Sequence, residues 1–148
     1  MQWNTLKIDE ELPLKVLLKD SVEEHAVLAR KLVHQNLWLN CKTHEQISLE
    51  DFDKWKSVYP EMTPAVADLV WHIPEGILLQ VACVDGNDLS WVGWPEGMVR
   101  TKDCIVCEFA DSFQRIALLK EIASSSHATD HRVRAARQAL KEQGYENI

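Results

Sequence analysis

Glycine is scarce in this sequence, and no glycine stands in a phosphate-binding pattern. The spacing of the glycines forms neither a P-loop nor the fingerprint of a dinucleotide-binding turn. No Gly-x-Ser-x-Gly motif marks a nucleophilic serine either. These absences exclude the largest families of nucleotide-binding proteins and serine hydrolases, but not an active site that only the fold assembles. The five glycines among the 148 residues are Gly76, Gly86, Gly93, Gly97 and Gly144.

Long hydrophobic runs and a surplus of positive charge are also missing. No apolar stretch reaches the length of a bilayer span, and the N-terminus has no positively charged region ahead of an apolar core. Asp and Glu outnumber Lys and Arg by 23 to 16, which gives a formal net charge of −7. We therefore expect no membrane partner. Nucleic acid is not expected either, because an acidic protein repels phosphates unless it has a local basic patch.

Cysteine is limited to positions 41, 83, 104 and 107, all within apolar or strand-like segments. A small secreted scaffold would instead place its cysteines at regular loop spacings. We therefore predict reduced thiols and a cytoplasmic protein. The chain has no linker, charge block or internal repeat, and its apolar content of 46% is that of a globular protein. These features predict a single α+β domain over residues 1–148.

The first half of the chain has patterns that predict α-helices. Apolar residues recur at three- and four-residue steps over residues 21–40. Ser48 is a suitable N-cap for a second helix over residues 48–59, and Thr63 followed by Pro64 opens a short third one. We expect these helices to cover one side of a sheet.

The middle of the chain predicts strands. Apolar runs over residues 77–84, 89–94 and 104–109, with a turn at residues 85–88, indicate an antiparallel meander of three strands. A fourth strand is expected over residues 3–8. Two further helices follow: one is capped by Asp111 and carries the apolar residues Phe113, Ile116, Leu119 and Ile122, and one is ended by Gly144. In the last strand, Ile105, Cys107 and Phe109 are expected on the core face. The predicted fold class is thus α+β: a three- or four-stranded antiparallel meander covered by N-terminal and C-terminal α-helices.

Four residues offer a tempting zinc site: Cys41-x-x-His44 and Cys104-x-x-Cys107. However, the second pair lies in a predicted strand, where residues three apart point to opposite faces. We therefore predict no metal and no cofactor, and whether the four residues meet is left open.

His127 and His131 are one helical turn apart and could form half of a metal or acid–base site. Solvated histidines are commoner in the first turn of a helix, so we assign no catalytic residue.

The final helix concentrates positive charge on one face. Arg134, Arg137 and Lys141 follow His131 on the same side of the helical wheel. This stripe predicts docking of an acidic partner, although a solvated outer face is the simpler interpretation. Arg132 falls among the apolar residues instead. We expect it to reach a carboxylate or backbone carbonyl groups, or to lie across an interface.

Trp91 and Trp94 are the second pair of candidate binding residues. As strand residues they face opposite sides, so at most one belongs to a single core layer. An exposed tryptophan is typical of protein interfaces.

These patterns together predict a non-catalytic protein that acts by binding another macromolecule, as a regulator, inhibitor or accessory subunit. The expected partner is a protein. One alternative is a small hydrolase or zinc-dependent enzyme whose His, Cys and Asp residues are assembled by the fold. A pocket lined by His72, Cys83, His127 or His131 would favour it. A second alternative is an acidic mimic of nucleic acid. A homo-oligomer also stays open.

Overall fold

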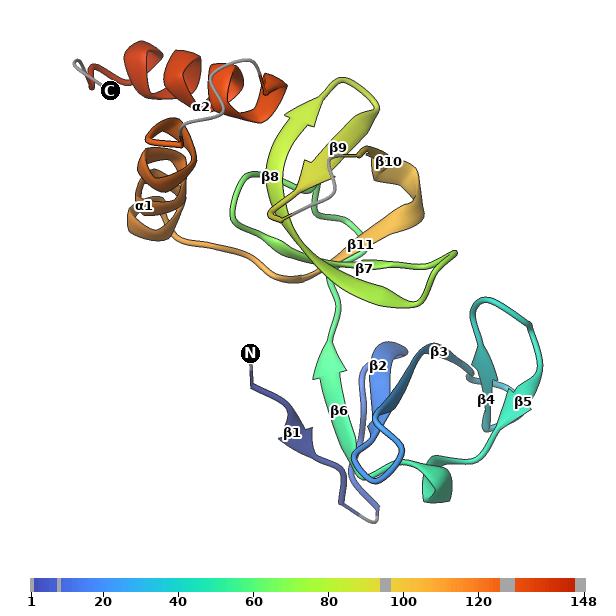
Figure 1. The fold of residues 1–148 in the computed structure, drawn as a ribbon. Helices are drawn as coiled ribbons and strands as arrows, with labels where there is room; N and C mark the ends of the chain where they lie inside the picture. The colour runs from blue at the N-terminus through green and yellow to red at the C-terminus, as the bar shows by residue number, and fades with distance from the viewer. Residues whose placement is uncertain (1, 8, 94–96, 126–129, 146–148) are drawn as a thin grey trace. The chain divides into compact units, whose positions relative to one another are not determined.

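The chain forms two compact units, each built around a β-sheet (Figure 1). The computed structural model describes residues 2–7, 9–93, 97–125 and 130–145. Unit 1 comprises Met1–Tyr59 and Ile73–Ile77, and unit 2 comprises Pro60–His72 and Leu78–Ile148. Compact units need not fold independently, so the single domain over residues 1–148 stays a prediction.

Unit 1 is a six-stranded antiparallel sheet with the strand order β1-β6-β2-β3-β4-β5. A single turn of 3-10 helix, η1 (Leu49–Asp51), precedes its last strand, and Ser48 caps this turn by accepting a hydrogen bond from the Glu50 amide. The strands are β1 (Asn4–Thr5), β2 (Lys15–Asp20), β3 (His25–Leu32), β4 (Leu37–Asn40), β5 (Gln46–Ile47) and β6 (Lys54–Ser57).

The core of unit 1 lies on one face of this sheet. Directly opposed residues of antiparallel strands share a face, and the register places Val16 opposite Ala29 and Leu18 opposite Val27. Partly buried aromatic and aliphatic side chains from β6 and from the segments around η1 complete the cluster. Its buried members are Leu12, Val16, Leu18, Val27, Ala29 and Trp38.

Unit 2 has a five-stranded sheet with the strand order β10-β9-β8-β7-β11. Gly86, with φ of 62°, forms the tight turn between β8 and β9, as predicted for residues 85–88. A second 3-10 turn, η2 (Thr101–Asp103), precedes the last strand. The strands are β7 (Leu69–His72), β8 (Ile77–Asp85), β9 (Asp88–Trp91), β10 (Val99–Arg100) and β11 (Cys104–Glu108).

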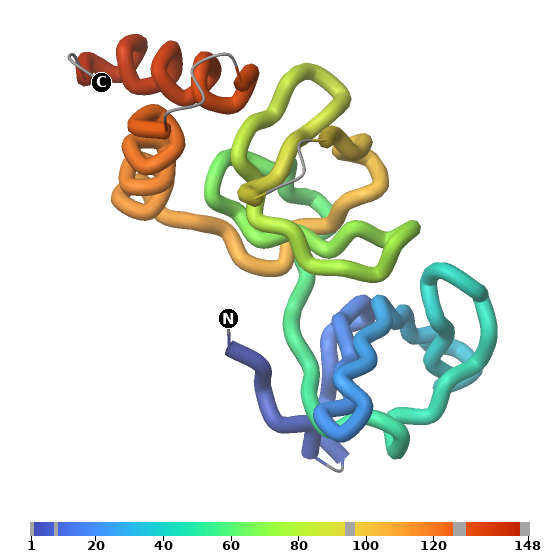
Figure 2. Tube along the Cα trace, in the orientation of Figure 1, coloured from blue at the N-terminus to red at the C-terminus, as the bar shows by residue number. Residues whose placement is uncertain are grey.

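Two α-helices follow this sheet and pack against each other (Figures 1 and 2). α1 (Ser112–Ala123) begins with a capping box between Asp111 and Gln114. α2 (His131–Glu142) ends at the predicted Gly144, whose φ is 89°. The core between the helices contains Leu119, Ala123, Ala136 and Leu140.

The two sheets share one topology, which is not visible as a sequence repeat. In each unit the fifth strand of the motif lies beside the first, and a 3-10 turn precedes it. The motif runs β6-β2-β3-β4-β5 in unit 1 and β11-β7-β8-β9-β10 in unit 2. The chain therefore repeats an arrangement of strands without repeating a residue pattern.

The predicted fold class, a meander of three or four strands covered by N-terminal and C-terminal helices, is wrong. The protein is mostly β, with sheets of six and five strands and two α-helices in the described part of the chain. Residues 21–40 form β3, β4 and their flanking turns. Buried side chains lie on both sides of β3, since Val27 and Leu28 point to opposite sides and are 8% and 3% exposed. The period of two that marks a half-buried strand is therefore lost.

The other predicted N-terminal helices also fail, for local reasons. Ser48 does act as a cap, but the helix stops after η1 and the chain extends into β6. Residues 63–68 form an irregular segment with a turn in which Ala67 has φ of 74°, outside the α-helical region. That turn leads into β7.

The predicted strand over residues 77–84 corresponds to β8, and the strand over residues 104–109 to β11. β11, however, pairs with β7 rather than extending the β8–β9 hairpin, whose outer neighbour is β10. The N-terminal strand is confirmed only over Asn4–Thr5.

Candidate functional site

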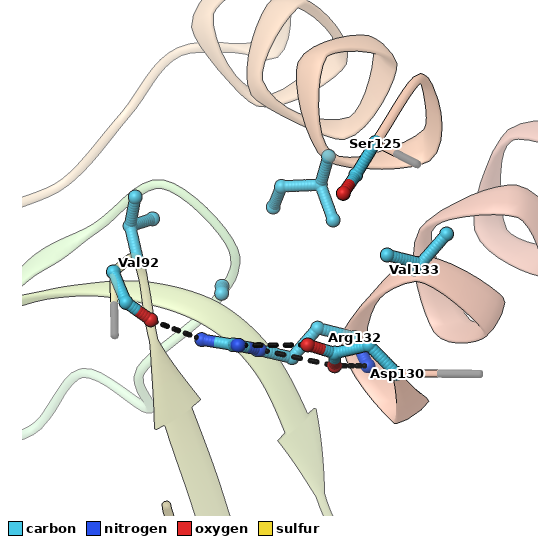
Figure 3. Close-up of a pocket in the computed structure, with 8 residues that line it drawn as sticks. Val92, Ser125, Asp130, Arg132 and Val133 are labelled. Atoms are coloured by element: carbon cyan, nitrogen blue, oxygen red, sulfur yellow. Dashed lines mark hydrogen bonds and ion pairs between the residues drawn. The ribbon is translucent and has the colours of Figure 1, made fainter. Parts of the chain in front are cut away.

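The buried ion pair between Asp130 and Arg132 connects the start of α2 to the end of β9 (Figure 3). The Arg132 side chain donates from Nε to Asp130 Oδ1 at 3.1 Å and from Nη2 to Asp130 Oδ2 at 2.7 Å. Its Nη1 donates to the backbone carbonyls of Trp91 and Gly93, both at 2.8 Å. The sequence-based expectation that Arg132 reaches a carboxylate or backbone carbonyls is confirmed on both counts.

Asp130 is the N-cap of α2 and accepts a hydrogen bond from the Arg132 amide at 2.8 Å. The hydrogen bonds from the Arg132 side chain lower the pKa of Asp130 to about 2, against the opposing effect of burial. The carboxylate is therefore charged throughout the physiological range. It is held as a structural anion and cannot act as a proton donor or acceptor near neutral pH.

A hollow of about 250 Å³ lies beside this pair. Ala82, Ile122 and Val133 give it an apolar wall, and Asp130 and Arg132 form its polar part (Figure 3). The polar atoms of the pair are already satisfied within the protein, so the hollow offers chiefly apolar contact. Its lining residues are Ala82, Val92, Gly93, Ile122, Ser125, Asp130, Arg132 and Val133.

His131 and Ser90 bring together a residue trio that superficially matches a hydrolase. His131 Nε2 is 3.3 Å from Ser90 Oγ, and His131 Nδ1 is 3.8 Å from Asp130 Oδ1. The second distance is too long for a hydrogen bond, and Asp130 is engaged by Arg132. Ser90 is 0% exposed, so its hydroxyl has no access to a substrate. The trio therefore lacks the accessible nucleophile that acyl transfer needs.

The residues of the predicted positive stripe have different surroundings. Arg134 and Lys141 are exposed on α2. Arg137 is half-buried, and its Nε donates to the carbonyl oxygen of Ala123 at 3.0 Å. Because Ala123 is the last residue of α1, Arg137 satisfies a free carbonyl at a helix C-terminus. His131 is 30% exposed and faces Ser90.

The tryptophan turn is only partly described. Trp91 is half-buried, and its ring lies against Gly97, where an added Cβ would be 2.9 Å from Trp91 Cη2. Trp91 thus packs within unit 2, and its carbonyl binds Arg132. Trp94 and His127 lie outside the described residues.

An exposed aromatic pair was not anticipated from the sequence. Phe113, expected in the core of α1, is 83% exposed, and Phe109, expected in the core of the sheet, is 54% exposed. A β-bulge between Val106 and Glu108 shifts the alternation of β11. As a result Val106 and Cys107 are both buried and Phe109 lies outside. We call Phe109 and Phe113 the aromatic pair.

The cysteines lack the features of metal ligands or nucleophiles. All four are thiols outside any disulfide, and among the described residues no group of three or more His, Cys, Asp or Glu side chains could hold a metal ion. Burial raises the pKa of the Cys104 thiol to about 11, with a contribution from Asp103. Burial also raises the pKa of Cys41 and of Cys83. Few thiolates are therefore present at neutral pH.

Comparison with models of protein families, with curated proteins and with solved structures found no match to this chain. None of the helices in the described part of the chain is long and apolar enough to cross a membrane.

Proposed function

We propose that this chain is a small non-catalytic cytoplasmic protein that acts by binding another protein, as a regulator, inhibitor or accessory subunit. The observation that carries the proposal is the exposure of the aromatic pair, above all of Phe113 at 83%. The pair marks the start of α1 as the contact surface.

Exposed phenylalanine favours association. Burying a Phe side chain contributes about 1.5–3 kcal/mol, and clustered aromatic residues form the energetic centre of many interfaces. The rest of α1 is well packed, since Leu118, Leu119 and Ala123 are buried. The folded unit therefore presents Phe113 on a rigid helix, where docking incurs little loss of conformational entropy.

The exposed cations Arg134 and Lys141 on α2 support a partner with complementary negative charge. Charges of this kind, at the rim of an interface, mainly raise the association rate and help select the partner. Arg137 is assigned no docking role, because it already binds the end of α1.

A cytoplasmic location is supported by the cysteines. All four are thiols outside any disulfide, which suits a reducing compartment. The hydrolase alternative gains no support from Ser90 and His131, because the serine is inaccessible. We therefore propose no second function.

Site-specific photocrosslinking would test the proposed function. A photoreactive phenylalanine analogue at position 113 is expected to crosslink to a discrete protein in cells of the source organism. The same analogue at position 22, where Val22 is 92% exposed on unit 1, serves as the matched control and should give no such product.

Phe113→Ser separates a binding role from a structural one. Because Phe113 is exposed, the substitution should change stability by less than about 0.5 kcal/mol while abolishing recovery of that partner by affinity capture of the chain without the photoreactive analogue. A large fall in melting temperature, or recovery that is unchanged, would contradict the proposal.

A further inference from the structure

The face of the unit 1 sheet opposite its core can be read from the strand register. Lys15, Leu17 and Lys19 alternate with the core residues of β2 and therefore point away from the core. Their partners on neighbouring strands share this second face. Lys15 opposes Arg30, Leu17 opposes Leu28 and Lys56, and Lys19 opposes Ala26 and Lys54. Thr5, Leu39 and Gln46 extend the same face to the outer strands.

This second face is basic, although the protein as a whole is acidic. The paired strand positions place five cations and no carboxylate on it. We call this set the basic face; its members are Lys15, Lys19, Arg30, Lys54 and Lys56.

Two pairs within the basic face oppose like charges directly. Lys15 lies across from Arg30, and Lys19 lies across from Lys54. Like charges at directly opposed positions destabilise a sheet. Folding alone therefore does not account for this arrangement, whereas a bound anion would offset the repulsion.

None of the four cations in these two pairs forms an ion pair with a carboxylate within the described part of the chain. The carboxylates beside them in sequence serve the β2–β3 turn instead. Asp20 accepts from the Val22 amide at 2.9 Å, and Asp53 accepts from the Ser21 amide at 2.8 Å. Lys54 makes a minor contribution to the lowered pKa of Asp53, after the hydrogen bonds from Ser21, but neither Lys19 nor Lys54 forms an ion pair with these acids.

The N-terminal segment adds an aromatic ring and neutral oxygens to this face. Lys19 Nζ lies 5.5 Å from the centre of the Trp3 ring. Lys54 Nζ donates to Thr5 Oγ1 at 3.4 Å, and the buried Lys56 donates to the Gln2 carbonyl at 3.0 Å. Trp3 is half-buried, so part of its ring is accessible beside the cations.

We propose that the basic face binds the phosphodiester backbone of single-stranded nucleic acid. Lys15 and Lys19 are four residues apart on β2, a span of about 13 Å at the usual strand rise. Together with Arg30 and Lys54 they form a positive track that a phosphate backbone can follow. An aromatic ring beside such a track can stack on a base without sequence preference.

A protein partner fits this face less well. The apolar side chains on it, Leu17 and Leu28, are 0% and 3% exposed, so they offer no apolar surface to a partner. Protein interfaces depend on apolar and aromatic anchors in their centres, whereas nucleic acid binding without sequence preference depends on lysine and arginine contacts to phosphates.

The net charge of −7 does not exclude such binding. The expectation against nucleic acid rests on this average and leaves room for a local basic patch. Exposed charges beyond about 8 Å are largely screened at physiological ionic strength, so a phosphate on the basic face interacts chiefly with the local cations. The net charge is expected to weaken binding most at low salt.

Fluorescence anisotropy with the full chain and a labelled 12-nucleotide oligothymidylate tests the proposal. The affinity should fall with rising salt, with a logarithmic slope of about −3, as expected for four phosphate contacts to a single strand. Lys19→Gln combined with Lys54→Gln should weaken binding about tenfold and reduce the slope to about −1.4. The matched control, Lys102→Gln combined with Lys141→Gln, removes two exposed cations of unit 2 and should leave the affinity unchanged.

Thermal stability gives a second readout that a merely structural role would not produce. Without oligonucleotide, the Lys19→Gln and Lys54→Gln variant should melt at the same or a higher temperature, because a like-charge pair is removed. The same concentration of oligonucleotide should raise the melting temperature of the wild type more than that of the variant, because the variant binds about tenfold more weakly.

Three outcomes would overturn the proposal. They are the absence of oligonucleotide binding at 50 mM salt, equal loss of affinity in the control variant, and equally tight binding of a polyglutamate peptide of the same charge. The last outcome would assign the basic face to an acidic protein. Crosslinking through Phe113 is a separate measurement, so the two proposals can fail independently.

Discussion

Replacing Arg132 tests whether the contact between α2 and β9 stabilises unit 2. Arg132→Ala would leave the buried carboxylate of Asp130 and the carbonyls of Trp91 and Gly93 without their partner. Removing one partner of a buried ion pair costs about 3–5 kcal/mol, because the other charge stays buried. For a chain of this length we expect a melting temperature lower by roughly 6–20 °C.

The assay is urea unfolding followed by circular dichroism at pH 7. Arg134→Ala provides a matched control: it removes the same side chain two residues away, at an exposed position of the same helix. Its effect should stay within about 0.5 kcal/mol. Arg132→Lys should fall between the two, since an ammonium group cannot reproduce the planar contacts of a guanidinium.

A double-mutant cycle isolates the ion pair from other effects. Arg132→Met keeps much of the side-chain volume but removes the charge, and Asp130→Asn removes the partner's charge while keeping a good N-cap. The double variant should be more stable than Arg132→Met alone, because no unpaired buried charge remains. Equal stability of the Arg132→Ala and Arg134→Ala proteins, or zero coupling in the cycle, would refute this account.

Three further perturbations have expected outcomes. The lowered pKa of Asp130, about 2, contributes up to about 2 kcal/mol of stability above pH 4. This contribution is lost as the pH falls through 2, so the stability gap between the wild type and Asp130→Asn should narrow in acid unfolding curves from pH 5 to pH 2. Asp68 is 2% exposed and accepts from the Ala65 and Ala110 amides and from Arg115; Asp68→Ala should lower the unfolding free energy in urea by about 3 kcal/mol. Gly97→Ala places a Cβ 2.9 Å from the Trp91 ring and should shift the tryptophan fluorescence and cost about 1–3 kcal/mol, whereas a spectrum identical to that of the wild type would contradict this packing.

Local signals in the sequence predicted the parts of the fold that depend on neighbouring residues. Asp85-Gly86 specifies a turn by backbone preference alone, and Asp111 and Gly144 specify helix ends in the same way. These positions are confirmed. The helix predicted over residues 21–40 is wrong because buried side chains lie on both sides of β3, a property set by distant strands and absent from any local window.

At the candidate site, too, some residues were predicted correctly and others were not. Arg132 was placed correctly because an arginine on the apolar side of a helix needs a buried acceptor wherever it points. Phe113 was placed wrongly because steps of three residues drift around a helix. After three such steps, from Phe113 to Ile122, the positions are about half a turn apart, so these two residues cannot share one buried stripe. The angular positions of these residues on the helical wheel therefore contain the signal that Phe113 lies outside the buried stripe.

The basic face could not be found from the sequence, because its members come from three strands whose register is set by tertiary pairing. Lys15, Arg30 and Lys54 are far apart in the chain, and only the order β6-β2-β3 brings them together. Net charge, which the sequence does give, points the opposite way.

The shared topology of the two units indicates whether strand arrangement or surface side chains carry function. If the arrangement of strands itself carried the function, the sheets of both units would present similar surfaces. The strands of unit 2 contain one cation, Arg100, and three carboxylates, Asp85, Asp88 and Glu108. Unit 1 instead concentrates five cations on one face. The same topology thus supports different surfaces, and function depends on the side chains placed on it. Charge-removing variants of unit 1 should therefore leave crosslinking through Phe113 intact, and Phe113→Ser should leave oligonucleotide affinity intact.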